Sequence, residues 1–235
     1  MRNIKVVVPN SLTAINLLCG AIASVLLFRG FIIEPVYLII IAAIADLLDG
    51  LVAKLLGATS EFGKQFDSLA DIISFGFAPS IFLYKSVLLV TDNKYSLIAY
   101  LVFIYLLFSA LRLARYNIEE NKTPDFKGLP VPAGALVIVS IWITIHYSDI
   151  EWLKSVVSPG FILVSTILLS SLMISSLPML SLKFKNFKLS ENIWRYTLII
   201  GVLVLYVFFK LSGLVFIMGY YILLSFIKYT INSSN

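Results

Sequence analysis

The sequence predicts an all-α fold: a polytopic membrane helix bundle of about eight transmembrane helices, with both termini cytoplasmic. Two observations predict it. Of the 235 residues, 60% are hydrophobic and only 13% are charged, whereas soluble domains are about one quarter charged. Apolar stretches of roughly 20 residues, the length that crosses a bilayer, recur along the whole chain. A soluble globule is therefore excluded, and residues 1–235 are expected to form a single membrane domain.

Residues that end helices separate the apolar stretches. Gly30 and Pro35 follow the first stretch, Asp92 follows the third, Pro159 opens the sixth, and Lys183 begins a basic connection. Polar residues interrupt the first stretch and no small-x-small cleavage site follows it, so we expect an uncleaved span rather than a signal peptide. In order, the expected spans are 11–28, 35–58, 61–90, 95–116, 131–147, 158–180, 193–209 and 212–229.

The basic residues predict the orientation of these spans. With eight crossings, five of the 18 Lys and Arg residues lie on the side away from the termini: Arg29, Lys85, Lys94, Lys154 and Lys210. The remaining ones lie on the side of the termini, and positively charged loops stay in the cytoplasm. We therefore expect a cell-membrane protein whose termini and loop near residue 58 face the cytoplasm. The net charge of +5 is scattered between apolar runs, which argues against nucleic acid as a partner.

Four aspartates stand among apolar residues in the second and third predicted spans: Asp46, Asp49, Asp67 and Asp71. An Asp at the centre of a membrane helix costs roughly 2.5 to 3.5 kcal/mol, so four unpaired ones would cost on the order of 10 kcal/mol. The nearest cations, Lys54 and Lys64, are too few to neutralise four carboxylates. Hard oxygen ligands without His or Cys suit Mg²⁺ or Mn²⁺, which makes these acids a candidate metal site.

The spacing of the acids supports their convergence. Residues three or four apart share one helix face, as in each of the two aspartate pairs. If the chain reverses at 58–60, Asp49 lies near the level of Asp67 and Asp46 near that of Asp71. Ser60 followed by Glu61 is a reasonable helix start, which supports this turn. Two divalent ions held there would suit phosphoryl transfer, because they stabilise both the attacking and the leaving oxygen.

Written out, this region reads Asp46-x-x-Asp49-Gly50-x-x-Ala53-Lys54, eight residues, then Gly63-x-x-x-Asp67-x-x-x-Asp71. This pattern resembles the signature of the CDP-alcohol phosphatidyltransferases. One position departs, because the family commonly has Arg where this chain has Lys54. Lysine keeps a charge that attracts phosphate but lacks the two-pronged guanidinium fork.

Three further segments resemble the phosphatidylserine synthase branch of that family. They are the opening Pro9-Asn10-Ser-Leu-Thr13-Ala-Ile-Asn16, the run Arg112-Leu-Ala-Arg115-Tyr116-Asn117, and Phe126-Lys-Gly128-Leu129-Pro130-Val-Pro132-Ala-Gly. Without the resemblance, Arg112 and Arg115 can also be interpreted as membrane-interface anchors, and the Gly-Leu-Pro segment as an ordinary loop. The resemblance covers residues 9–134, and the remaining spans carry no chemistry that we can identify.

The resemblance implies transfer of the phosphatidyl group of CDP-diacylglycerol, or of a CDP-archaeol-like lipid, to L-serine, giving phosphatidylserine and CMP. It implies that Asp46, Asp49 and Asp67 hold two Mg²⁺ or Mn²⁺ ions, and that Asp71 contacts one ion and acts as general base. It places Gly50, Lys54 and Ser60, and more weakly Asn10 and Thr13, near the nucleotide. Arg112 and Arg115 would bind the serine carboxylate or a phosphate oxygen. Relatives commonly form homodimers, so a homodimer is expected.

Two other functions remain open from the residues alone. The acids handle phosphate transfer without selecting the alcohol, so glycerol phosphate or an inositol phosphate would serve the same chemistry. An ion-coupled transporter would also hold acids within the membrane. Transport typically uses paired repeats, whereas these four acids lie in one hairpin without a counterpart in the second half. The single histidine, His146, lies near the opposite face and receives no role, and the single cysteine, Cys19, excludes an intramolecular disulfide.

Overall fold

The computed structural model describes residues 2–91, 97–118, 126–179, 189–209 and 214–233, most of which are helical. Each predicted span falls on a helical segment, so the helical class is confirmed. In chain order the helical elements are α1 (Arg2–Phe28), α2 (Glu34–Leu55), α3 (Glu61–Asp71), η1 (Ile72–Phe77), α4 (Ala78–Thr91), η2 (Leu97–Phe103), α5 (Ile104–Ile118), α6 (Val131–Tyr147), α7 (Glu151–Val156), α8 (Pro159–Ile174), α9 (Leu189–Phe209) and α10 (Leu214–Ser233).

Several of these helices match the dimensions of a bilayer, so the protein is a multi-pass membrane protein. Four segments are long and apolar enough to cross it, namely 5–28, 34–55, 61–91 and 97–118. Shorter apolar helices cover 131–147, 159–174 and 192–205. Eight complete crossings and the cytoplasmic position of both termini stay predictions, since four segments of the described chain are both long and apolar enough to cross.

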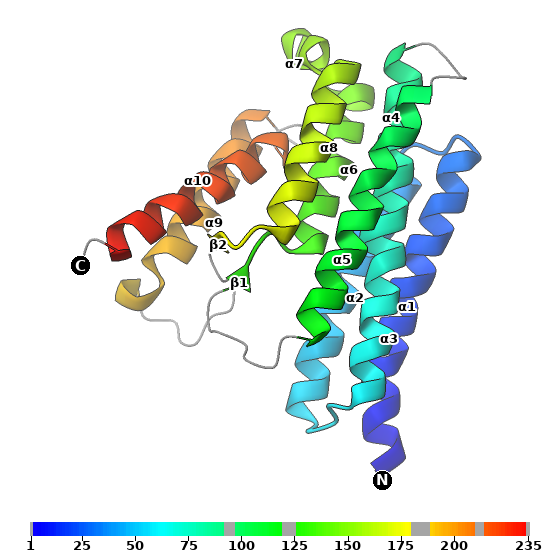
Figure 1. The fold of residues 1–235 in the computed structure, drawn as a ribbon, viewed down its shortest axis with the longest axis vertical. Helices are drawn as coiled ribbons and strands as arrows, with labels where there is room; N and C mark the ends of the chain where they lie inside the picture. Colours follow the sequence, from blue (N-terminus) through cyan, green and yellow to red (C-terminus); the bar gives the residue numbers. More distant parts are fainter. Residues whose placement is uncertain (1, 92–96, 119–125, 180–188, 210–213, 234–235) are drawn as a thin grey trace.

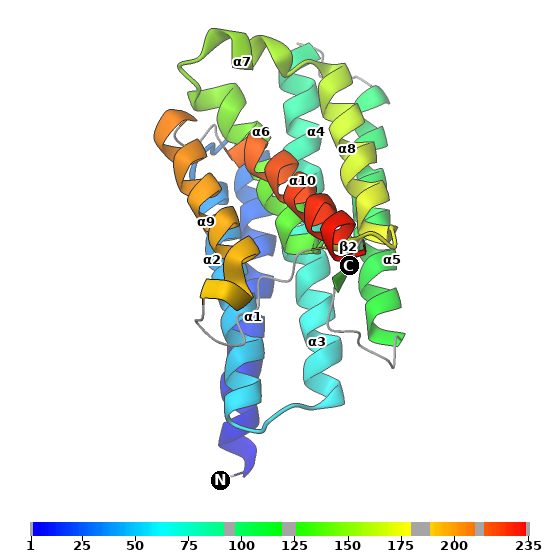
Figure 2. The same ribbon diagram turned by 90° about the vertical axis from the view of Figure 1, so that its left-hand side faces the viewer.

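The long helices run side by side along the longest axis of the molecule (Figure 1), with α7 at one end and the N-terminus at the other. The turn between α2 and α3 lies at the end that holds the N-terminus. Helix α10 runs obliquely and crosses α6, against which it packs (Figure 2). Helix α9 pairs with α10, so these last two helices form a C-terminal hairpin.

The third predicted span is a continuous helical rod built from three segments. Helix α3 starts at the predicted place, because Ser60 caps it and accepts a 3.0 Å hydrogen bond from the Gly63 amide. The preceding turn uses Gly57 at φ +59°, a conformation that glycine adopts easily. A π-helical turn, η1, follows Asp71 and joins α3 to α4. Such insertions often mark functional sites in helices.

The segment from Phe126 to Pro130 has more structure than the sequence indicated. A two-residue strand, β1 (Phe126–Lys127), pairs antiparallel with β2 (Pro178–Met179), so the fold is not purely helical and helix α8 ends at Ile174, short of the predicted 180. Gly128 has φ +72°, and a Cβ built on it would lie 2.6 Å from the Met173 carbonyl oxygen. Leu129 donates a 3.0 Å hydrogen bond to the Leu172 carbonyl. This loop therefore docks on the open end of α8, where only glycine fits.

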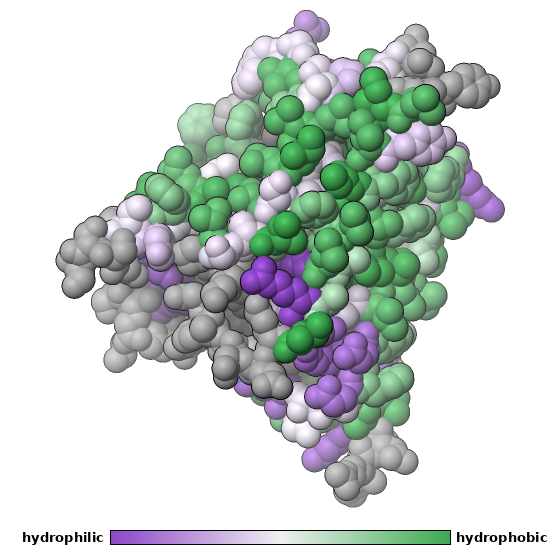
Figure 3. Space-filling model, in the orientation of Figure 1, coloured by the Kyte–Doolittle hydropathy of each residue, from purple (hydrophilic) through white to green (hydrophobic). Residues whose placement is uncertain are grey.

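Apolar side chains fill the interior and also cover much of the exterior. Fully buried residues such as Ile39, Phe82 and Ile138 belong to one core shared by α2, α4 and α6. Large apolar residues also lie exposed along the helices, as expected for a surface that meets lipid tails. Hydrophilic residues gather at the lower end of the face in Figure 3, around the ends of α3 and α5, while hydrophobic residues cover the upper part. The polar region thus occupies one end of the bundle.

Candidate active site

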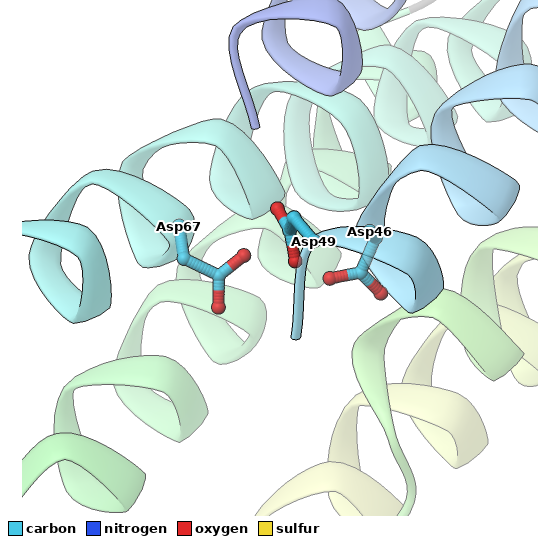
Figure 4. A group of neighbouring side chains, drawn as sticks. All are labelled: Asp46, Asp49 and Asp67. Carbon is cyan, nitrogen blue, oxygen red and sulfur yellow. The ribbon is translucent and has the colours of Figure 1, made fainter. Parts of the chain in front are cut away.

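Three of the four aspartates converge between α2 and α3. Asp46 and Asp49 lie on α2 and Asp67 on α3, with their carboxylates turned toward one another (Figure 4). One carboxylate oxygen of each lies within 4.8 Å of one from the other two. Asp49 is buried, and the other two are half-buried. The predicted convergence of these three side chains is confirmed.

Helix geometry explains the register of the acids. Asp49 lies six residues before the end of α2 at Leu55, and Asp67 lies six residues after the start of α3 at Glu61. At 1.5 Å per residue both are about 9 Å from the turn. The antiparallel helices therefore bring the two carboxylates to the same level.

The fourth acid, Asp71, lies one turn further along α3 and is buried. Its Oδ1 accepts a 3.1 Å hydrogen bond from Asn16 Nδ2 on α1. Asp71 is thus held against α1, one helical turn beyond Asp67.

Helix α1 supplies neutral donors to this region. Thr13 Oγ1 donates a 2.6 Å hydrogen bond to Asp49 Oδ2, so this side chain contacts an acid directly. Asn16 is fully buried, and its main-chain carbonyl accepts a 2.6 Å hydrogen bond from Ser74 Oγ in η1. The sequence pattern included Asn16 in a motif, but no role was predicted for it. Its position three residues after Thr13, on the same helix face, would have indicated that both side chains face the acids.

Two of the proposed nucleotide-side residues meet at the start of α3. A Cβ built on Gly63 would lie 3.1 Å from Ser60 Oγ and 3.4 Å from Asn10 Oδ1. Asn10 of α1 therefore lies beside the cap of α3, and Gly63 permits this approach. Gly50 and Lys54 are exposed on α2, and a Cβ on Gly50 would meet no atom within 4 Å. The surface next to Asp49 is accordingly open on that side.

Lys64 does not neutralise the acids in this structure. Its Nζ donates a 2.7 Å hydrogen bond to the carbonyl of Asn117, near the end of α5. Asn117 Nδ2 in turn donates a 2.8 Å hydrogen bond to Ser68 Oγ. These contacts tie the helix that carries Asp67 to the helix that carries Arg112.

The two arginines of α5 have different surroundings. Arg112 is half-buried and its Nε is buried without a hydrogen-bond partner. Arg115 is exposed, and its Nη1 donates a 3.4 Å hydrogen bond to the Ile174 carbonyl at the end of α8. The structure therefore buries the Arg112 Nε within the bundle and directs Arg115 toward α8.

The donor set fits hard divalent cations. Asp67 Oδ1 is buried and has no hydrogen-bond partner, which is costly unless a cation or substrate group meets it. The protein partners of Asp49 and Asp71 noted above are a hydroxyl and an amide, which leave the carboxylate charges uncompensated. Carboxylate oxygens are the ligands that Mg²⁺ and Mn²⁺ prefer. Asp46, Asp49 and Asp67 are the residues that could hold such an ion.

Comparison with protein families gives a match to the model described as CDP-alcohol phosphatidyltransferase, over residues 6–177. The matched segment runs from α1 past the end of α8 and contains all four aspartates and both arginines. Helices α9 and α10 lie outside it.

Curated relatives resemble the chain over most of its length. A CDP-diacylglycerol--serine O-phosphatidyltransferase of Helicobacter pylori is 32% identical over 94% of this chain and 90% of its own. The protein of the same name in Bacillus subtilis is 33% identical over 68% of this chain and 88% of its own. An archaetidylserine synthase of Methanothermobacter thermautotrophicus is 34% identical over 69% of each chain.

Proposed function

The chain belongs to the CDP-alcohol phosphatidyltransferase family, and from this membership we propose that it transfers a phosphatidyl group from a CDP-linked lipid to the hydroxyl of L-serine. The products are phosphatidylserine and CMP. The names of the relatives from Helicobacter and Bacillus support serine as the acceptor. The archaeal relative makes an archaetidyl lipid, so either CDP-diacylglycerol or a CDP-archaeol-like lipid is a suitable donor.

One observation carries this proposal: three carboxylates from two helices lie within 4.8 Å of one another inside a membrane protein. Asp46, Asp49 and Asp67 would hold Mg²⁺ or Mn²⁺, and Asp71, one helical turn beyond Asp67, would contact one of two ions. Bound there, the ions would neutralise the diphosphate and stabilise the attacking and leaving oxygens of an in-line displacement. Uncompensated acids in a membrane interior otherwise have no structural benefit.

Asp71 is the proposed general base. A free hydroxyl is a weak nucleophile at neutral pH, so a carboxylate in hydrogen-bond reach is needed to accept its proton. The serine oxygen then forms a bond to the lipid-side phosphorus while the bond to the CMP oxygen breaks and CMP leaves with the electron pair. Asn16 would orient Asp71 through the 3.1 Å hydrogen bond from its amide. Direct displacement needs no covalent intermediate on the protein.

The exposed side of α2 and the start of α3 form the proposed nucleotide side of the site. Gly50 leaves open space there, and Lys54 supplies a positive charge to a phosphate. Ser60 and Asn10 lie together at the start of α3, at the same end of the bundle as Lys54. Thr13 would act on the donor side indirectly, by fixing Asp49 through its 2.6 Å hydrogen bond.

The proposed site lies toward the end of the bundle that holds the N-terminus and the turn between α2 and α3 (Figure 1), since Asp49 and Asp67 are each about 9 Å from that turn. The distribution of basic residues predicts that this end faces the cytoplasm, where CMP and serine are soluble. Lipid tails would lie among the apolar outer faces of the helices. Homodimer formation stays a prediction that rests on the resemblance alone.

The decisive assay uses the full chain purified in detergent, with CDP-diacylglycerol and labelled L-serine. We expect labelled lipid and an equal amount of CMP, complete loss of both with EDTA, and recovery with Mg²⁺ or Mn²⁺. Glycerol phosphate serves as the control acceptor and should release no CMP. Release with glycerol phosphate but not with serine would assign another acceptor, and incorporation that EDTA leaves unchanged would contradict the metal role.

A further inference from the structure

One buried oxygen next to the proposed general base has no partner. Asn16 of α1 is fully buried, and its Oδ1 forms no hydrogen bond with any residue that the structure describes. The Nδ2 of the same side chain donates a 3.1 Å hydrogen bond to Asp71 Oδ1. An ionised carboxylate only accepts hydrogen bonds, so the amide turns its nitrogen toward Asp71 and leaves its oxygen without a donor. Buried acceptors of this kind are rare in native proteins unless a ligand or water meets them.

The packing of α1 against η1 fixes the position of this amide. The Ser74 hydroxyl donates a 2.6 Å hydrogen bond to the main-chain carbonyl of Asn16. One turn further along α1, Gly20 lies directly against the main chain of Ser74, where a side chain would clash. The backbone that carries Asn16 is therefore held against the π-helical turn that follows Asp71.

The hydroxyl groups on either side of Asn16 are engaged elsewhere. A hydroxyl group has one proton to donate. Thr13 donates to Asp49 Oδ2 at 2.6 Å, and Ser74 donates to the main chain of Asn16. Neither of these two groups has a proton left for Asn16 Oδ1. The expected donor is therefore a molecule that binds in the site.

The acceptor substrate carries a suitable donor in a suitable place. In L-serine the ammonium group and the hydroxyl group are on neighbouring carbon atoms. A hydroxyl group that lies at Asp71 therefore sets the ammonium group within reach of the amide that is hydrogen-bonded to Asp71. An ammonium group has three N–H donors and no acceptor, so it complements an unpartnered carbonyl oxygen.

We propose that Asn16 Oδ1 accepts a hydrogen bond from the ammonium group of the amino-acid acceptor, while Asn16 Nδ2 holds Asp71 toward the acceptor hydroxyl. Asn16 is then a specificity-determining residue, because it contacts the group that distinguishes serine from glycerol phosphate and inositol phosphate. This inference rests on the proposed function, since it takes an amino acid as the acceptor. Amide oxygens also bind divalent cations, and the test separates these two occupants.

The test compares L-serine with β-hydroxypropionate, which keeps the hydroxyl and the carboxylate but has hydrogen in place of the ammonium group. We would measure kcat/KM for CMP release by the full-length protein in detergent, and divide the value for serine by the value for β-hydroxypropionate. Asn16→Ala removes both amide atoms, whereas Asn16→Asp keeps an acceptor oxygen and loses the donor. Thr13→Ala is the matched control, because Thr13 on the same face of α1 also donates to a carboxylate, that of Asp49.

The wild type should prefer serine, and in Asn16→Ala we expect this preference to fall about tenfold, because a hydrogen bond to a charged group is lost. The poorer orientation of Asp71 slows the reaction of both acceptors and cancels in the ratio. In Asn16→Asp both activities should fall, while the preference for serine stays at least as strong as in the wild type. In Thr13→Ala the preference should stay unchanged.

Four results would overturn the inference and leave the proposed function intact. A wild type that uses both acceptors equally well would show that the ammonium group has no partner. An unchanged preference in Asn16→Ala would restrict Asn16 to positioning Asp71, and a raised Mg²⁺ requirement with it would assign Oδ1 to the metal ion. A preference that falls in Asn16→Asp would contradict the role of the oxygen, even if Asn16→Ala does not fold.

Failure of the proposed function has a different signature. A wild type that releases no CMP with serine would refute the proposed function itself. The two failures are therefore distinct.

Discussion

The polar region between α1, α2 and α3 and the apolar region between α4 and α6 differ in what their side chains contribute to the protein. In the first, Thr13 and Asn16 hold carboxylates that remain close together and uncompensated. In the second, Phe82 and Trp142 meet edge to face at 5.5 Å, and the Trp142 indole donates a 2.9 Å hydrogen bond to the Ile32 carbonyl. One region therefore keeps functional groups at a cost in stability, and the other supplies the packing that offsets this cost.

The largest expected effect in the polar region is on turnover. Asp71→Asn should lower kcat about 10²- to 10⁴-fold, the usual contribution of a general base, because an amide cannot accept the proton. Binding of a CDP-lipid analogue should persist, since Asp46, Asp49 and Asp67 remain. CMP release and analogue binding by calorimetry would measure this. His146→Gln is the control with unchanged turnover, and full activity in Asp71→Asn would contradict the assigned base.

The largest expected effect in the apolar region is on stability. Phe82 is fully buried, so Phe82→Ala should lower the free energy of unfolding by about 3 kcal/mol. We take the lower end of the range for aromatic residues because lipid tails weaken the hydrophobic contribution and leave mainly packing. Thermal unfolding in detergent would measure the change. At temperatures below the unfolding midpoint of the variant, the KM for serine should equal that of the wild type. An altered KM would mean that packing in the apolar region affects the polar region.

A smaller effect on activity should follow from the neutral donor to Asp71. Asn16→Ala should reduce kcat/KM about 10- to 100-fold, the range for residues that orient a metal-site ligand. The free energy of unfolding should fall only slightly, because Asp71 loses one hydrogen-bond donor but stays in place. Kinetics and thermal unfolding on the same sample would separate these effects. A loss of stability as large as that of Phe82→Ala would show that Asn16 is mainly a packing residue.

The smallest expected effect concerns the link between α3 and α5. Lys64→Met removes the 2.7 Å hydrogen bond to the Asn117 carbonyl and should cost about 1 kcal/mol of stability. The dependence of activity on the Mg²⁺ concentration should stay unchanged, because the Lys64 ammonium group contacts the Asn117 carbonyl and not the acids. A titration of activity with Mg²⁺ would check this. A shifted titration would mean that the lysine charge reaches the metal site after all.

The sequence alone determined the helical membrane class and the placement of Asp49 and Asp67 at one level. Composition and the length of apolar runs suffice for the first, and fixed helix geometry on either side of a capped turn suffices for the second. It did not predict the strand pair that docks Gly128 on α8, nor the short helix α7, because neither has a hydrophobic period. Local patterns do not encode contacts between segments that lie fifty residues apart.

Only the tertiary structure decided which polar residues share the interior with the acids. The sequence offered Lys54 and Lys64 as the nearest cations, yet the ammonium group of Lys64 contacts the Asn117 carbonyl. It gave Asn16 no site, because Asn16 reaches Asp71 across 55 positions of the chain. The direction in which a side chain points within a bundle depends on how whole helices cross, and that angle is set by packing over their full length.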